Sequence, residues 1–363
     1  MLERDTTFIL GAGASFDLGF PLGDTLRDRI IELLAVEDPN ASINFSDAEM
    51  GKILQTRSVS EAGTNASPDR LEVYRRAAAT IRAGLPFARS IDTFIDGLRG
   101  REHIEFLSKL AIATVILRAE AGSPLTPRHV QAANAADLRA QQLKKLLASW
   151  HVELSQILYD GHTADTLDDV FAHASFIVFN YDRCLEEFLA VSLMRRFGID
   201  RKRAVALVGN CQVVHPYGQV GAFAPDAEGF IPFGGHEVQQ LVDVAGRIRT
   251  FTETMESDVG DKIKDTVAQA DTLVFLGFGW LAQNMALLQV GQRLTNARQV
   301  FATTMKMEAG EVAVVRDQIY EILRRGDYTP DYVDPAPDPP EFITDRGDCK
   351  ALMANCWLRL TRR

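Results

Sequence analysis

Short apolar runs recur along the chain and predict the buried strands of a sheet. They lie at 7–10, 176–179, 273–276 and 299–302, and a fifth, less regular run falls at 205–208 or 213–214. Runs of this length bounded by turn residues are typical of strands that are covered on both faces. Helical patterns separate most of them, so the sequence predicts an α/β fold with a Rossmann-like, doubly wound parallel sheet.

One interval between the predicted strands is too long for a simple crossover. Much of it is rich in Ala, Leu, Arg and Glu at helical spacing, for instance over 71–82, 104–119 and 132–158, and loop-like segments lie at 38–45 and 56–69. We therefore expect a large, mainly helical insertion over 38–165, which divides the domain that holds the sheet into 1–37 and 166–325. Five prolines at 328–340 predict that the last part, 326–363, is an irregular C-terminal strap.

Charge and composition argue against several classes of protein for this chain. A net charge of −10 argues against broad electrostatic binding of nucleic acid. No apolar run is long enough to span a membrane, and the charged first residues do not resemble a secretory signal. The four cysteines are scattered, without the spacing of a zinc site. We expect a cytoplasmic protein with reduced thiols and no metal.

A glycine turn follows the first predicted strand. The segment Gly-Ala-Gly-Ala-Ser at 11–15 leads into a helical pattern that begins near Leu22. Such a turn can direct backbone N–H groups and a positive helix end at a phosphate, which indicates a nucleotide. Phe16 occupies the place of the third glycine of a dehydrogenase fingerprint, and 25–36 is helical instead of a second strand ending in an acid, so hydride transfer is disfavoured. Alternatively, the turn merely connects a strand to a helix.

Polar side chains follow two further predicted strands. Asn180 and Asp182 come directly after the run at 176–179, where open α/β sheets bind ligands. Asp182 could equally cap the helix that follows. His215 leaves an apolar segment and enters a Pro/Gly turn, a setting in which an imidazole is held yet reachable for proton exchange. A structural histidine is the alternative there.

A second glycine turn follows the run at 273–276. Gly277 and Gly279 could again bring N–H groups close to a phosphate, and Asn284 lies a few residues further on. Trp280 between them could be an ordinary core residue. Four strand ends thus carry two glycine turns, an Asn-x-Asp and a histidine, and we expect the four to form one site.

These segments together resemble the sirtuin-like family, specifically its bacterial branch associated with antiphage defence. The turn at 11–15 with Gly-Phe-Pro at 19–21 is similar to the family's Gly-Ala-Gly-x-Ser and Gly-x-Pro signature, and Asn-Tyr-Asp at 180–182 to its Asn-x-Asp motif. The segment 213–221 is similar to the histidine segment, and 275–279 with Asn284 to the later phosphate- and ribose-facing turn. The resemblance covers about 1–35 and 170–305.

The resemblance implies a protein that binds NAD and breaks the bond between nicotinamide and ribose. Asn180 would position the ribose or the attacking water, Asp182 would hold the nicotinamide amide, and His215 would act as general base. The cofactor-binding residues it implies are Gly11, Ala12, Gly13, Ser15, Gly277, Gly279 and Asn284.

Two departures from the family pattern favour one activity within it. The four-cysteine zinc module of deacylating members is absent, and Pro216 and Tyr217 separate His215 from Gly218 where the family has His-Gly. Both disfavour protein deacylation, so we expect an NAD hydrolase that releases nicotinamide and ADP-ribose. The resemblance further implies a regulated antiviral effector that forms a homo-oligomer or works with a partner such as an ATPase. The alternatives are a non-catalytic NAD or ADP-ribose sensor or scaffold, and an NAD-dependent deacylase or ADP-ribosyltransferase.

Overall fold

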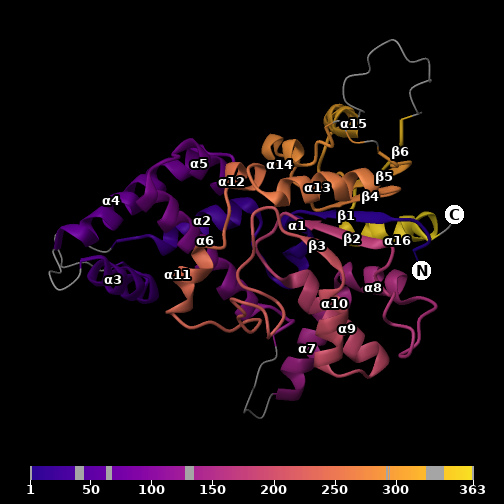
Figure 1. Ribbon diagram of the computed structural model, residues 1–363, viewed down its shortest axis with the longest axis horizontal. Helices are drawn as coiled ribbons and strands as arrows, with labels where there is room; N and C mark the ends of the chain where they lie inside the picture. The colour runs from indigo at the N-terminus through magenta and orange to yellow at the C-terminus, as the bar shows by residue number, and fades with distance from the viewer. Residues whose placement is uncertain are drawn as a thin grey trace.

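A parallel sheet lies at the centre of the computed structural model, which describes residues 2–36, 45–62, 68–126, 135–291, 293, 295–323 and 339–361. Its strands are β1 (Thr6–Leu10), β2 (Ala174–Val178), β3 (Gln212–Val214), β4 (Thr272–Leu276), β5 (Gln299–Thr303) and β6 (Glu341–Asp345). They are ordered β3-β2-β1-β4-β5-β6 and every pair is parallel (Figure 1). The predicted Rossmann-like, doubly wound α/β fold is confirmed, because the strand order reverses between β1 and β4.

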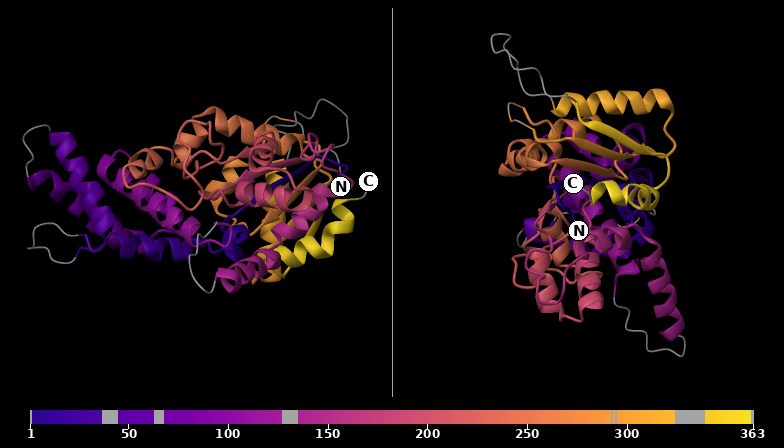
Figure 2. Two further views of the ribbon diagram at one scale, coloured as in Figure 1. Left: turned by 90° about the horizontal axis from the view of Figure 1, so that it is seen from below. Right: turned by 90° about the vertical axis from the view of Figure 1, so that its right-hand side faces the viewer.

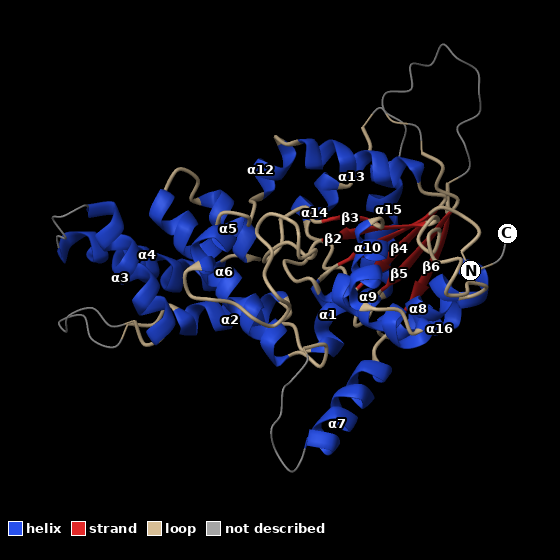
Figure 3. Cartoon of the chain, turned by 60° about the horizontal axis from the view of Figure 1, so that its bottom comes forward, coloured by secondary structure: helices blue, strands red, loops and turns tan. Residues whose placement is uncertain are grey.

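Successive side chains of the central strand enter two different cores. Phe8 and Leu10 pack into a core on one face of the sheet, and Ile9 between them packs into the core on the other. Figure 3 shows helices on both faces. The helices on the Phe8 face are α8 (His151–Tyr159), α9 (Cys184–Phe197), α10 (Arg201–Gly209) and α16 (Cys349–Leu360), and those on the other are α13 (Asp258–Gln269), α14 (Ala282–Leu287) and α15 (Ala309–Leu323).

Four strands lie where the apolar runs predicted them, and two places differ. The fifth strand is at Gln212–Val214, whereas 205–208 belongs to α10. The chain over 341–345 and 349–360, expected to be irregular, forms the edge strand β6 and helix α16. An edge strand is half exposed and has few buried side chains, so β6 lacks a continuous apolar run. Most of the proline-rich segment 328–340 lies outside the described residues.

The long interval between β1 and β2 is mainly helical and divides into two parts. Helices α2 (Gly23–Leu33), α3 (Ala48–Ala62), α4 (Pro68–Gly84), α5 (Ile91–Gly97) and α6 (Glu102–Gly122) form a lobe beside the sheet, with α11 (Gln240–Ala245) and α12 (Phe251–Met255) added later in the chain. Figure 2 shows α3 and α4 reaching furthest from the strands. Helices α7 (Ala135–Ala148) and α8 lie instead with the core on the Phe8 face.

The helical expectations within this interval hold in part. The patterns at 71–82 and 104–119 lie inside α4 and α6. The pattern at 132–158 is two helices separated at 149–150, and its first residues lie outside the described chain. Segment 56–69 was expected to be a loop, but α3 continues to Ala62 and α4 begins at Pro68, so most of its described residues are helical. Segment 38–45 is outside the described residues except for Phe45.

Within the described ranges, no helix combines the length and apolar character needed to cross a membrane. All four cysteines are buried and none forms a disulfide.

Candidate active site

A cavity of about 410 Å³ lies beyond the carboxyl ends of the strands, at the point where the strand order reverses. Open α/β sheets bind their ligands at this place, and the volume is in the range of about 300–1,000 Å³ that small-molecule sites occupy. The segments after five strands contribute to it. Its sequence-predicted members are Gly11, Ala12, Gly13, Asn180, Asp182, Gly277, Gly279 and Asn284.

The two glycine turns are packed against each other. Gly13 donates its N–H to the carbonyl of Gly277 at 3.0 Å, and Gly11 donates to the carbonyl of Leu276 at 3.0 Å. A Cβ on Gly11 would lie 2.5 Å from the Gly277 oxygen. The N–H groups of Gly11 and Gly13 are therefore taken by backbone carbonyls, and these two glycines join the ends of β1 and β4. In the described structure, Ala12 and Gly279 have backbone N–H groups without a hydrogen-bond partner, and both line the cavity.

Asn180, Ser15 and Asp182 form one hydrogen-bonded chain. The Asn180 amide donates to the Gly11 carbonyl at 3.1 Å and to Ser15 Oγ at 3.0 Å, and Ser15 Oγ donates to Asp182 Oδ1 at 3.1 Å. Ser15 thus supports the site from behind and does not line the cavity. With both amide hydrogens engaged, Asn180 Oδ1 makes no hydrogen bond within the described chain and is not fully enclosed, so it can accept one from a ligand.

Asp182 is almost fully buried, and both its burial and the nearby acidic side chains raise its pKa. Burial raises the pKa of Asp182 to about 7, an N–H bond from Cys184 opposes this, and the charges of Glu120 and Glu186 raise it further. The bond from Cys184, at 3.0 Å, comes from the first residue of helix α9, but the N-cap residue of this helix is Arg183 and makes no side-chain cap bond, so the alternative that Asp182 is the helix cap is wrong. A carboxyl group with this pKa exists in both protonation states near neutral pH.

Asp92 is a second carboxyl group in the cavity and was missed from the sequence. It lies in the first turn of α5, where Ser90 caps the helix by accepting from Thr93 N–H. The Tyr181 hydroxyl donates to Asp92 Oδ1. Burial raises the pKa of Asp92 to about 6, although the Tyr181 hydrogen bond lowers it. An acid in the first turn of a helix is an ordinary stabilising feature, so nothing in its sequence context distinguished Asp92.

The insertion holds Asp92 in place through contacts with the sheet domain. Thr93 donates its hydroxyl to Gln283 Oε1 on α14 at 3.0 Å, and Gln283 donates to Asp96 Oδ2 at 3.1 Å. Asp96 also accepts from Thr252 on α12 at 3.2 Å. Helix α5 therefore forms one wall of the cavity and is attached to elements that follow β3 and β4.

His215 lies outside the cavity, on the far side of its wall. Its Nδ1 donates to the Asn180 carbonyl at 3.0 Å, and its Nε2 lies 2.9 Å from Glu186 Oε1. Burial alone would lower the pKa of His215, but the Glu186 charge and hydrogen bond outweigh it and raise the pKa. Both ring nitrogens are occupied, and the neighbouring Glu186 carboxylate favours the protonated form of the imidazole. The structure therefore brings His215 close to the backbone of Asn180 but does not place its ring among the cavity-lining groups.

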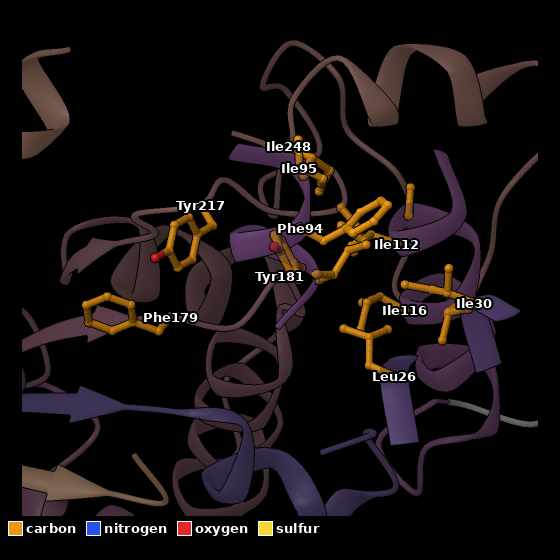
Figure 4. Close-up of a cluster of buried hydrophobic side chains, with 14 of the residues drawn as sticks. Leu26, Ile30, Phe94, Ile95, Ile112, Ile116, Phe179, Tyr181, Tyr217 and Ile248 are labelled. Atoms are coloured by element: carbon orange, nitrogen blue, oxygen red, sulfur yellow. The ribbon is translucent and has the colours of Figure 1, made fainter. Parts of the chain in front are cut away.

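Tyr217 is the residue of this segment that faces the cavity. Its hydroxyl donates to Asn284 Oδ1 at 2.7 Å, and its ring lies edge-on to Phe179, with centroids 6.0 Å apart. Figure 4 shows Phe179, Tyr181 and Tyr217 beside apolar side chains of the helical lobe. Phe179 also meets Phe278 edge-on at 5.1 Å. The wall next to Asn180 is thus aromatic, which suits a planar ring system.

A buried ion pair fixes the segment that carries Asn180 and Asp182. Arg183 is bidentate to Glu120 of α6, with Nε 3.1 Å from Oε1, and both side chains are inaccessible to solvent. Arg183 Nη1 also donates to the carbonyl of Ala222 at 3.1 Å. The pair thus joins the insertion to the loop after β3. Because these bonds use most of the guanidinium donors, Arg183 does not line the cavity, whereas the neighbouring Asp182 does.

Comparisons with protein-family models, curated proteins and solved structures found no match to this chain. The described residues contain no cluster of three or more His, Cys, Asp or Glu side chains suited to a metal ion.

Proposed function

We propose that this protein is an NAD glycohydrolase that cleaves NAD to nicotinamide and ADP-ribose. The observation that carries the proposal is the pair of carboxyl groups, Asp182 and Asp92, with pKa values raised to about 7 and about 6 in one cavity beside Asn180. Groups that titrate near neutral pH inside a cleft are characteristic of catalytic sites. The likeness of four segments to sirtuin-like proteins supports NAD as the substrate.

The cavity offers complementary groups for each part of NAD. The unpartnered N–H groups of Ala12 and Gly279 suit the pyrophosphate, and the aromatic wall of Phe179, Tyr217 and Phe278 suits a planar base. Asp182 in its protonated form would donate to the carboxamide oxygen of nicotinamide. Asn180 Oδ1 would accept from a ribose hydroxyl or from the attacking water.

The reaction requires one water and one proton acceptor. As the bond between the ribose C1′ and the nicotinamide nitrogen breaks, its electron pair neutralises the pyridinium, and C1′ gains oxocarbenium character. The water oxygen bonds to C1′ and releases a proton, which Asp92 would accept as general base. Asp92 and not His215 would take this role, because both nitrogens of His215 are hydrogen-bonded outside the cavity.

The proposal is tested by incubating the full chain with NAD and following nicotinamide release. The matched variant is Asn180→Ala, which should lower the rate while NAD binding survives, because binding also uses the two turns and the aromatic wall. Since an unregulated hydrolase would deplete the NAD of its own cell, the assay is repeated across protein concentrations and with candidate defence-system partners. Release that depends on concentration would support regulation through a homo-oligomer.

A non-catalytic NAD or ADP-ribose sensor is the second candidate, and the position of His215 favours it. The sequence-predicted base is enclosed in an ion pair, as in a structural site. A sensor would bind NAD measurably and release no nicotinamide under any of these conditions. Transfer to an acyl-lysine or to a protein acceptor would instead give O-acetyl-ADP-ribose or a modified protein.

A further inference from the structure

A second cavity, of about 460 Å³, lies beside the edge strand β3 and shares no residue with the first. It is bounded by the end of β3, the loops around 218–222 and 246–249, and the first turns of α13. The segment 215–218 separates the two cavities, since His215 and Gly218 line the second and Tyr217 lines the first.

The charged side chains that line the second cavity are all basic. Arg247, Arg249 and Lys262 contribute to it, together with the imidazole of His215, and no carboxylate is among its described lining residues. Within the described chain these three cations form no ion pair, whereas many other Arg and Lys residues are paired. In a chain of net charge −10, three cations gathered around one cavity without a counter-charge favour an anionic ligand.

Two glycines and the neighbouring backbone hold Arg247 and Arg249 in position. A Cβ on Gly218 would lie 2.0 Å from the Arg247 carbonyl oxygen, and a Cβ on Gly229 would lie 2.0 Å from Arg247 Nη2. Both glycines have positive φ, at +74° and +77°. Arg249 donates its N–H to the Tyr217 carbonyl at 2.9 Å. The Arg247 guanidinium thus lies directly against a loop that only glycine allows, and less entropy is lost when it binds a ligand.

We propose that this second cavity is a binding site for a small anion bearing a phosphate group. Arginine forks match phosphate oxygens, and Lys262 adds a mobile point charge at the rim. The site does not depend on NAD cleavage, because none of its residues lines the first cavity. A ligand bound here would contact the segment 215–218, which carries Tyr217 on the side of the first cavity. The same segment is linked to the first site by the hydrogen bond from His215 to the Asn180 carbonyl.

The test is calorimetric titration of the full chain at low ionic strength with inorganic phosphate, pyrophosphate and AMP, and with adenosine as the uncharged control. We expect at least one phosphate-bearing probe to bind and adenosine not to bind. AMP alone would indicate a nucleotide, and phosphate or pyrophosphate alone would indicate recognition of the anion itself. Arg247→Gln and Arg249→Gln should each weaken binding at least about tenfold.

Two further variants separate loss of the site from loss of the fold. Lys262→Glu is at an exposed position and should weaken binding while the thermal unfolding midpoint is kept. Arg82→Gln, on the exposed face of α4, removes the same charge elsewhere and should leave binding unchanged. NAD affinity should be the same in all four variants. The proposal is overturned if no phosphate-bearing probe binds, or if the three cavity variants bind like the Arg82 control.

Discussion

Gly13 donates its backbone N–H to the carbonyl oxygen of Gly277 at 3.0 Å, which joins the turn after β1 to the turn after β4. The two strands are neighbours at the point where the sheet reverses its order, and the cavity opens above this contact. These glycines therefore have a structural role, because they allow the two backbones to come into contact and so form the floor of the cavity.

This contact predicts that Gly277→Ala is destabilising. Gly277 has φ +56°, and a Cβ there would lie 2.3 Å from the Ala14 nitrogen, so the variant adds both left-handed strain and a clash with backbone. We expect a loss of about 2–5 kcal/mol in the free energy of unfolding, measured with urea. Gly279→Ala is the matched control, because nothing lies within 4 Å of its Cβ position. Equal stability of the two variants would contradict this description of the turns.

Asp92→Asn should lower the rate of nicotinamide release by roughly 10²–10⁴ if Asp92 is the general base. NAD affinity should change little, because the amide keeps the shape of the side chain. Asp96→Asn, on the same helix, is the control, since Asp96 bonds Thr252 and Gln283 but does not line the cavity. Steady-state kinetics on both variants decide the question. If both variants lose the same fraction of the rate, Asp92 is not the general base and α5 has only a structural role in the site.

Asp182→Asn should change how stability depends on pH. In the folded protein the pKa of Asp182 is about 7, above its value in the unfolded chain, so the group stabilises the fold fully at low pH. That contribution is lost as pH rises from about 4 through about 7, and it amounts to up to about 4 kcal/mol. Relative to the wild type, the variant should therefore gain stability over this window. Parallel urea-unfolding curves across the same pH range would show that Asp182 titrates normally.

His215→Ala should affect stability more than chemistry. The substitution leaves the Glu186 carboxylate buried without its partner, and breaking a buried ion pair costs about 3–5 kcal/mol. The rate per folded molecule should fall by less than about tenfold. The base role implied by the resemblance predicts instead a loss of roughly 10²–10⁴. Kinetics normalised to the folded fraction, from unfolding curves on the same samples, separate the two outcomes.

The sheet could be predicted because its central strands are short apolar runs that end in distinctive turns. The ends of these strands also located Asn180, Asp182 and the glycine turns, since parallel strands end at one edge. Asp92 could not be found in this way, because it reaches the cavity from a helix whose position depends on tertiary contacts. His215 shows the converse: its segment was correctly placed at the site, but backbone geometry after β3 turns Tyr217 inward instead.

Whether the first cavity hydrolyses NAD is decided by the fate of NAD in water enriched in oxygen-18. Hydrolysis in the first cavity predicts nicotinamide and ADP-ribose in equal amounts, with one labelled oxygen on the ribose carbon of the ADP-ribose, and neither product from the Asn180→Ala/Asp92→Asn double variant. If NAD binds with measurable affinity but is recovered intact with every partner and at every protein concentration, the protein is a sensor and not an NAD hydrolase.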